Sequence, residues 1–211
     1  MKNNFCTFYI VRHGESEWNV KRILHGQTKD IPLTPNGLKQ ANQTAKKLNN
    51  IDFAAAYSSD LLRAQRTAEI IALDHNLLVK TNHLLRERYF GRLEGITVNN
   101  FLEEFKDLLK VREQLSTEVR FKSKIIPEVE SDEEIASRLF TFLREIAVAY
   151  MGKNVLIVSH GGLMHATLIK LGFANYQELP YSSIKNTSYF IIDSDGVEFF
   201  LKKTFGIKKY N

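Results

Sequence analysis

Cysteine is nearly absent from this sequence: Cys6 is the only one among 211 residues. A single cysteine excludes an internal disulfide framework, and its position in an apolar run predicts a small buried side chain rather than a reactive thiol. Long hydrophobic segments are absent too, so the sequence offers neither a membrane span nor the apolar core of a signal peptide. We therefore expect a cytoplasmic protein with no membrane partner.

A strong charge of one sign is also missing. The formal net charge is +5, and charges of both signs are interspersed along the chain. This balance favours anionic partners only weakly and gives no reason to expect nucleic-acid binding. Because 211 residues suit one α/β domain and the sequence has no repeat, low-complexity tract or linker, we expect residues 1–211 to form one domain. No feature indicates an oligomeric state.

Short apolar runs alternate with segments of helical periodicity. Thr34-Pro35 marks one helix start, the capping-box pair Ser131 and Glu134 marks another, and residues 58–60 can cap a third. Strands are expected at 8–11, 53–57 and 155–158, an extended segment at 77–85, and a hairpin at 188–192 and 197–201 around DSDG. The alternation predicts an α/β fold, with a mostly parallel sheet covered on both faces and an antiparallel hairpin at its C-terminal edge.

Residues 89–130 interrupt this alternation. The segment is charged and partly helical, with an apolar stripe of Phe101, Phe105 and Leu108, and we expect it to form a lid or cap. Its cations either meet a second anionic group of a ligand or form a solvated face: Lys110, Arg112, Arg120, Lys122 and Lys124.

Two of the predicted strands end in the same way. FYIVRHGES carries His13 and VLIVSHGGL carries His160, each followed by glycine. Ligands of open α/β sheets gather beyond the carboxyl ends of the strands, so the two histidines are expected to lie side by side. A single histidine at a strand end is usually structural, but a matched pair indicates a site. A metal is not expected, because no third histidine or carboxylate stands at ligand spacing.

The residues around the histidines suit a phosphate ligand. Arg12 offers a planar fork of donors to phosphate oxygens, and Gly161 opens a helix whose N-terminus favours anions. A neutral imidazole is a nucleophile, and nearby arginines disfavour its protonated form, so His13 is expected to be neutral and able to attack.

Other segments can complete such a site. Arg63 lies in the first turn of a helix after a strand, and Asn19 can donate to a phosphate oxygen. Taken alone, Arg63 would be a solvated helix charge and Asn19 an ordinary loop residue. Glu87 and Glu94 flank a glycine-containing loop, where a sheltered carboxyl near phosphate could serve as a general acid. His25 lies in the loop after His13 and is either an ordinary polar residue or part of the site.

The ordered blocks RHGES with Asn19, LTPNGLKQA, SSDLLRAQRTA, LLRERYFGRLEG and SHGG resemble the histidine phosphatase superfamily, also called phosphoglycerate mutase-like. The resemblance implies a three-layer α/β/α sandwich that needs no metal or other cofactor. It implies that His13 is phosphorylated and that Glu87 is the acid and base. The residues that it implies for phosphate and substrate binding are Arg12, Asn19, His25, Gly26, Gln27, Arg63, His160 and Gly161.

Hydrolysis of a small phosphorylated metabolite is the expected reaction. The Gly26-Gln27 step and FGRLEG resemble the broad phosphatases of the superfamily, and residues 89–130 are shorter and poorer in proline and paired arginines than the insertion of the mutases. Because LRERYFG is close to the mutase form of that loop, a bisphosphate-dependent phosphoglycerate mutase is the alternative. A non-catalytic phospho-ligand binding module is a more remote one.

Overall fold

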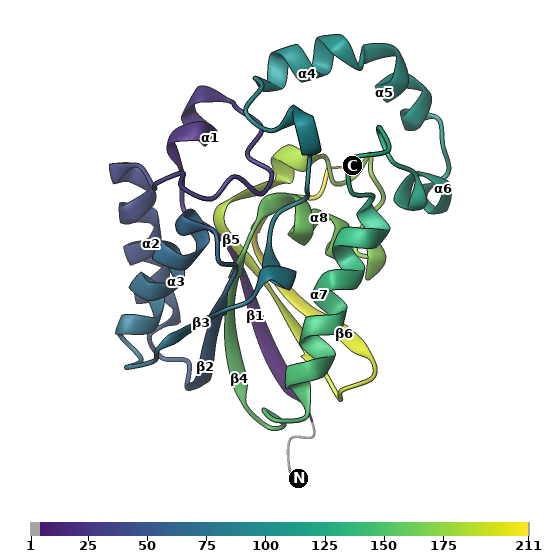
Figure 1. Cartoon of the computed structure of the whole chain (residues 1–211). Helices are drawn as coiled ribbons and strands as arrows, with labels where there is room; N and C mark the ends of the chain where they lie inside the picture. The colour runs from purple at the N-terminus through teal and green to yellow at the C-terminus, as the bar shows by residue number, and fades with distance from the viewer. Residues whose placement is uncertain (1–4, 211) are drawn as a thin grey trace.

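The computed structural model describes residues 5–210, which form a six-stranded sheet between two layers of helices (Figure 1). The strand order is β3-β2-β4-β1-β5-β6. β1 to β4 are parallel, whereas β5 and β6 run antiparallel at one edge, as predicted for the C-terminal hairpin. The strands are β1 (Cys6–Arg12), β2 (Phe53–Ser58), β3 (Val79–Thr81), β4 (Asn154–Ser159), β5 (Ile184–Ser194) and β6 (Phe199–Ile207).

The two helical layers cover opposite faces of the sheet (Figure 1). α2 (Pro35–Leu48) and α3 (Leu62–Leu73) lie on one face, and α7 (Asp132–Ala147) and α8 (Gly161–Lys170) lie on the other. Successive residues of a strand point to opposite faces, so Ile10 packs in the core with α7 and α8 while Val11 packs in the core with α2 and α3. The predicted three-layer α/β/α arrangement is confirmed.

Two of the three predicted helix starts are correct. Thr34 accepts the amide of Gly37 at 2.9 Å at the start of α2, and Ser131 and Glu134 form a capping box at the start of α7. The prediction for residues 58–60 is wrong, because α3 has Leu61 at its N-cap and no side-chain cap. The hydroxyl of Ser59 is instead directed towards the end of β4, where it contacts His160.

The segment 89–130 leaves the sheet and forms an arch above the carboxyl ends of the parallel strands (Figure 1). The predicted stripe is broken at Phe105, where one short helix ends and the next begins, so Leu109 rather than the exposed Leu108 joins Phe101 and Phe105 in a small apolar core. We call residues 89–130 the cap segment. Its helices are η2 (Gly91–Leu93), α4 (Val98–Glu104), α5 (Lys106–Glu113) and α6 (Thr117–Lys122).

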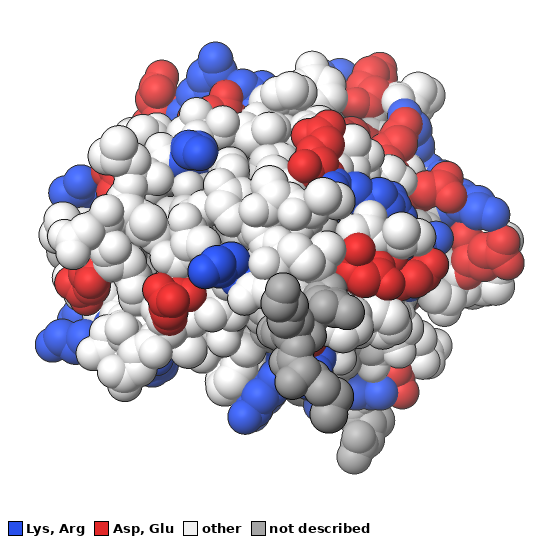
Figure 2. Space-filling model, turned by 90° about the horizontal axis from the view of Figure 1, so that it is seen from below, with Lys and Arg blue, Asp and Glu red and all other residues white. Residues whose placement is uncertain are grey.

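The remaining elements are short. The extended segment predicted at 77–85 is a strand only at Val79–Thr81 and then turns into η1 (His83–Leu85), whose last residue is buried. α1 (Glu17–Lys21) follows β1, and η3 (Tyr181–Ser183) precedes β5. Figure 2 shows the face at the lower end of the sheet, where Lys and Arg and Asp and Glu are scattered among uncharged residues. Within residues 5–210, no helix has the length and apolar character needed to cross a membrane.

Candidate active site

His13 and His160 lie next to each other because their strands are neighbours in the sheet. β1 and β4 pair in parallel with Arg12 opposite Ser159, and the amide of His13 donates to the carbonyl of Ser159 at 3.0 Å. The centroids of the two rings are 5.1 Å apart, and both rings are buried. The predicted juxtaposition is confirmed.

The hydrogen bond of His13 determines which of its nitrogens can react. Nδ1 lies 2.7 Å from the carbonyl oxygen of Gly14. A carbonyl oxygen can only accept, so Nδ1 carries the proton and Nε2 keeps its lone pair. Burial, followed by the charges of Arg63 and Arg12, lowers the pKa of His13 well below its ordinary value of 6.5. His13 is therefore a neutral imidazole with a free Nε2.

Two guanidinium groups flank His13, and backbone carbonyls rather than carboxylates hold them. Arg63 is fully buried and donates to the carbonyls of Thr28 and Gly26, both at 2.9 Å, and burial lowers its pKa to about 10. Arg12 donates to the carbonyl of Ile184. Within residues 5–210 neither arginine forms an ion pair, so their positive charge is available to an anion.

His160 stands at the N-terminus of α8, directly before Gly161. Its Nε2 lies 2.7 Å from the hydroxyl of Ser59, whose oxygen also accepts the amide of Leu61. Nδ1 has no hydrogen-bond partner among residues 5–210, so it is the nitrogen that can meet a ligand. Burial and the charge of Arg63 lower the pKa of His160 well below 6.5.

The carboxylate of Glu87 is fixed by backbone amides. It accepts from Gly162 at 2.9 Å, from Leu163 at 3.2 Å and from Arg88 at 2.7 Å. A Cβ at position 162 would lie 2.4 Å from Oε1 of Glu87, so this contact requires glycine there. The Glu87 carboxylate is thus bound at the N-terminus of α8, the helix that begins directly after His160.

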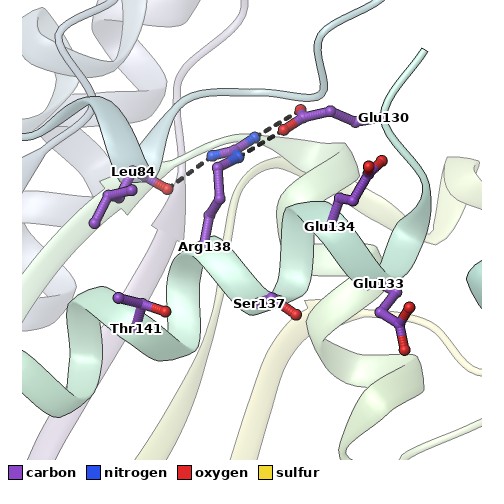
Figure 3. Close-up of a pocket in the computed structure, with 7 residues that line it drawn as sticks. All are labelled: Leu84, Glu130, Glu133, Glu134, Ser137, Arg138 and Thr141. Atoms are coloured by element: carbon purple, nitrogen blue, oxygen red, sulfur yellow. Dashed lines mark hydrogen bonds and ion pairs between the residues drawn. The ribbon is translucent and has the colours of Figure 1, made fainter. Parts of the chain in front are cut away.

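Hydrogen bonds of Arg138, on α7, hold the loop that carries Glu87 (Figure 3). Arg138 donates twice to the Glu130 carboxylate at 2.8 Å, and it also donates to the carbonyl of Leu84 at 2.8 Å and of Glu87 at 3.3 Å. Figure 3 shows Arg138 reaching from α7 between Leu84 and Glu130, in a shallow hollow that no histidine lines. None of the predicted site residues lines this hollow.

Arg88, the residue after Glu87, anchors the same loop to α7. Arg88 is buried and forms an ion pair with Asp132, which also accepts the hydroxyl of Tyr176 at 2.7 Å. The opposite charge of Arg88 contributes to lowering the pKa of Asp132, against the effect of burial. Sequence reasoning missed this pair, because neither residue has a distinctive local pattern.

Asn19 and His25 both line the cavity above His13. The Oδ1 atom of Asn19 accepts from the amide of Ser16 at 3.0 Å and from Asn186 at 3.3 Å, which leaves its Nδ2 group to donate to a ligand. The Nε2 atom of His25 lies 2.6 Å from the hydroxyl of Ser16. Burial, with the charges of Arg63 and Arg12, lowers the pKa of His25 to about 3.

Gln27 and Glu94 lie outside the wall of the cavity. Gln27 donates through its side chain to the carbonyl of Glu87 at 3.2 Å, so it supports the acid loop. Glu94 accepts the amide of Gln27 at 2.9 Å and packs over Gly26, where a Cβ would lie 2.1 Å from its carboxylate. Of the two carboxylates that the sequence offered, only Glu87 lines the cavity.

The cavity has a volume of about 690 Å³ and joins the carboxyl end of the sheet to the cap segment. The predicted site residues on its wall are Arg12, His13, Asn19, His25, Gly26, Arg63, Glu87 and Gly161. The ring of His160 is not on the wall but lies next to the His13 ring. Sequence reasoning did not identify the apolar wall. The aromatic residues of the cap segment were a signal for it, but which of them face inward depends on the break at Phe105.

Two residues near these elements lie outside the site. Arg66 is exposed and pairs with Glu69 at 3.1 Å, and His165 is buried in packing against Tyr181, with ring centroids 4.1 Å apart. Across residues 5–210, no three His, Cys, Asp or Glu side chains are arranged to hold a metal ion.

Comparison with known proteins agrees with this geometry. The sequence model of the histidine phosphatase superfamily (branch 1) matches residues 8–205. The uncharacterized phosphatase PhoE of Bacillus subtilis (strain 168) is 31% identical over 202 residues, which cover 96% of this chain and 92% of PhoE. The probable phosphoglycerate mutase GpmB of Escherichia coli O1:K1 / APEC is 35% identical over 166 residues, which cover 77% and 74% of the two chains.

A solved structure shares the fold along nearly the whole chain. The phosphoglycerate mutase of Bacillus anthracis str. Sterne superposes with a TM-score of 0.80 at 24% identity, covering 98% of this chain and 95% of its own. The three-layer sandwich is thus a phosphoglycerate mutase-like fold.

Proposed function

Because the chain belongs to the histidine phosphatase superfamily, we propose that it hydrolyses phosphate monoesters through a phosphohistidine on His13, without a metal. The observation that carries the proposal is the contact between Nδ1 of His13 and the carbonyl oxygen of Gly14, from which the tautomer of His13 follows. Its Nδ1–H is bound by the Gly14 carbonyl at 2.7 Å, so Nε2 has a lone pair in a cradle of cations. Similarity to PhoE, a protein named as a phosphatase, supports hydrolysis as the outcome.

In the first step, Nε2 of His13 attacks phosphorus in line with the ester oxygen. The P–N bond forms, the P–O bond to the organic group breaks, and Glu87 gives its proton to the leaving oxygen. Arg12, Arg63 and the Nδ1–H of His160 donate hydrogen bonds to the equatorial oxygens and stabilise their negative charge. Asn19 donates a further hydrogen bond to one of these oxygens. This is stabilisation by preorganised donors.

In the second step, a water molecule takes the place of the leaving group. Glu87, now ionised, accepts its proton, oxygen attacks phosphorus, and the P–N bond breaks with its electron pair returning to Nε2. Inorganic phosphate leaves, and His13 is again neutral with its proton on Nδ1. We further propose that residues 1–211 act as one domain, in which the cap segment covers a small phosphorylated metabolite.

Quenching with alkali and denaturant during turnover of a radiolabelled phosphate ester tests the mechanism. We expect acid-labile, base-stable label on His13, and we expect His13→Ala to lose both the label and the release of phosphate. Near wild-type turnover by His13→Ala would contradict the proposal. A complete lack of p-nitrophenyl phosphate turnover by the wild type, with phosphate still bound, would favour a non-catalytic binding module.

Phosphoglycerate mutase activity is the second candidate, because of the similarity to GpmB. A mutase uses the same phosphohistidine but returns the phosphoryl group to a second hydroxyl of the substrate. The two reactions are separated by measuring phosphate release from several monoesters and the conversion of 3-phosphoglycerate with its bisphosphate present. Conversion much faster than hydrolysis would assign the chain to the mutases.

A further inference from the structure

The segment at the start of β5 contacts two residues of the phosphate site. The carbonyl of Ile184 accepts a hydrogen bond from the guanidinium of Arg12. The carbonyl of His13 accepts the side chain of Asn186 at 3.0 Å and the amide of Thr187 at 3.4 Å. Because 173 positions separate Asn186 from His13 in the sequence, only the fold brings these groups together.

The backbone of this segment is irregular. The pairing of β5 with β1 ends at Tyr189, opposite Val11, and the register of β5 against β6 shifts between Ile184 and Tyr189. Thr187 has a φ of 56°, in the left-handed region that a β-branched residue rarely adopts. Such strain persists where the surrounding structure fixes the backbone, and it gathers at functional sites. The neighbouring Asn186 is therefore a candidate for a functional role.

The His13 carbonyl determines the orientation of the Asn186 amide. A carbonyl oxygen can only accept, so the atom of Asn186 that lies 3.0 Å from it is Nδ2. The same Nδ2 lies 3.3 Å from Oδ1 of Asn19 and donates its second hydrogen there. Asn19 consequently turns its own Nδ2 away from Asn186, which leaves this group to donate in the cavity that Asn19 lines.

The local hydrogen bonds of Asn19 do not connect it to His13. Its Oδ1 also accepts the amide and the hydroxyl of Ser16, both at 3.0 Å, in the capping box that opens α1. These bonds fix Asn19 within α1, a helix of five residues of which none is buried. Asn186 bonds to Asn19 and to the backbone of His13 at once, so it ties this short helix to the nucleophile.

We propose that Asn186 is a positioning residue for phosphoryl transfer, which fixes the amide of Asn19 relative to the nucleophile His13. The inference rests on the proposed function, in which Asn19 donates to an equatorial oxygen of the phosphate. A donor stabilises the transition state most when it is held in the productive geometry before the reaction. Asn186 does not line the cavity, so it acts through Asn19 and not on the substrate.

Replacing Asn186 by apolar residues tests the proposal in steady-state hydrolysis of p-nitrophenyl phosphate. Asn186→Ala and Asn186→Leu should both lower kcat/KM by about 5–10-fold, the size of one hydrogen bond to a misplaced donor. Leucine has the same branched shape as asparagine but donates no hydrogen bond. Wild-type kcat/KM in Asn186→Leu would show that Asn186 only fills space, and it would overturn the proposal.

A double-mutant cycle determines whether Asn186 acts through Asn19. Asn19→Ala should itself lower kcat/KM. Adding Asn186→Ala to it should cost at most about a further twofold, because the His13 carbonyl keeps the amide of Thr187. Losses that multiply in the double variant would overturn the proposal, since an effect on folding or on His13 alone is independent of Asn19.

Ser188→Ala is the matched control in the same segment. The Ser188 hydroxyl donates to the carbonyl of Lys185 at 2.6 Å, so kcat/KM should stay within about twofold of wild type. A loss as large as that of Asn186→Ala would assign the effect to the segment as a whole and overturn the proposal.

The label on His13 separates failure of this inference from failure of the proposed function. Each of the overturning results above leaves the wild type with hydrolysis and with base-stable label on His13. If the wild type showed neither hydrolysis nor label, the proposed function would be removed, and this inference with it.

Discussion

Arg88 and Asp132 form an ion pair in the protein interior, directly behind the proposed acid and base Glu87. The amide of Arg88 donates to the Glu87 carboxylate at 2.7 Å, and its guanidinium also donates to the carbonyl of Glu130 at 2.5 Å. The pair therefore ties the acid loop to the start of α7. Arg88 depends on Asp132 for its only counter-charge within ion-pair distance among residues 5–210.

Replacing Asp132 should destabilise the protein strongly. Asp132→Ala leaves Arg88 buried without a counter-charge, and we expect the free energy of unfolding to fall by about 3–5 kcal/mol in denaturant titration. Glu118→Ala, which breaks the exposed pair with Lys122, is the control and should change it little. Equal effects of the two substitutions would show that the buried pair is unimportant.

The role of Glu87 should depend on the leaving group. A general acid assists an alkoxide more than a nitrophenolate, which leaves without a proton. We expect Glu87→Gln to lower kcat for an alkyl phosphate by about 10²–10⁴-fold and to affect p-nitrophenyl phosphate much less. The check is steady-state kinetics with both esters on one preparation. The same loss for both esters would argue for a role in binding only.

The hydrogen bond from Ser59 should matter for the orientation of His160. Ser59→Ala removes the hydroxyl that lies 2.7 Å from Nε2, and the loss of about 1 kcal/mol predicts a roughly fivefold lower kcat/KM. Ser58→Ala is the neighbouring control, because the Ser58 hydroxyl is buried with no partner among residues 5–210. If the two variants have equal activity, Ser59 does not position His160.

Stability should fall as the pH is lowered. Burial lowers the pKa of His165 from 6.5 to about 4 and that of His25 to about 3. Below pH 6.5 the unfolded chain takes up protons that these folded histidines do not bind, so their contribution is complete above 6.5 and is lost on going down towards pH 4. Each of the two histidines lowers the free energy of unfolding by up to about 1.4 kcal/mol for each pH unit below 6.5 in that window.

Denaturant titrations between pH 7.5 and 5 test this pH dependence. His165→Gln should reduce the slope of unfolding free energy against pH, whereas His83→Gln, at an exposed site, should leave the slope unchanged. A wild-type stability that does not change between pH 7 and 5 would contradict the prediction.

The local features of this protein could be predicted from its sequence alone. Two apolar runs ending in histidine and glycine predict strands with reactive ends, and the side-by-side placement of His13 and His160 follows because parallel strands end at one edge. Thr34 and the pair Ser131 and Glu134 marked their helix starts because capping acts within one turn of the chain. These interactions are short in range, so a local pattern is enough to specify them.

The relationships between distant segments depend on tertiary packing and could not be predicted from the sequence. Glu87 and Glu94 are equivalent in the sequence, yet the backbone amides at the start of α8 hold Glu87 on the cavity wall while Glu94 packs over Gly26. Arg120 was one of several cap cations, and its place on the cavity wall, packed on the Tyr176 ring, follows from the position of α6. The burial of a side chain and the pairing of its charge depend on how segments far apart in the sequence pack together, which no local pattern encodes.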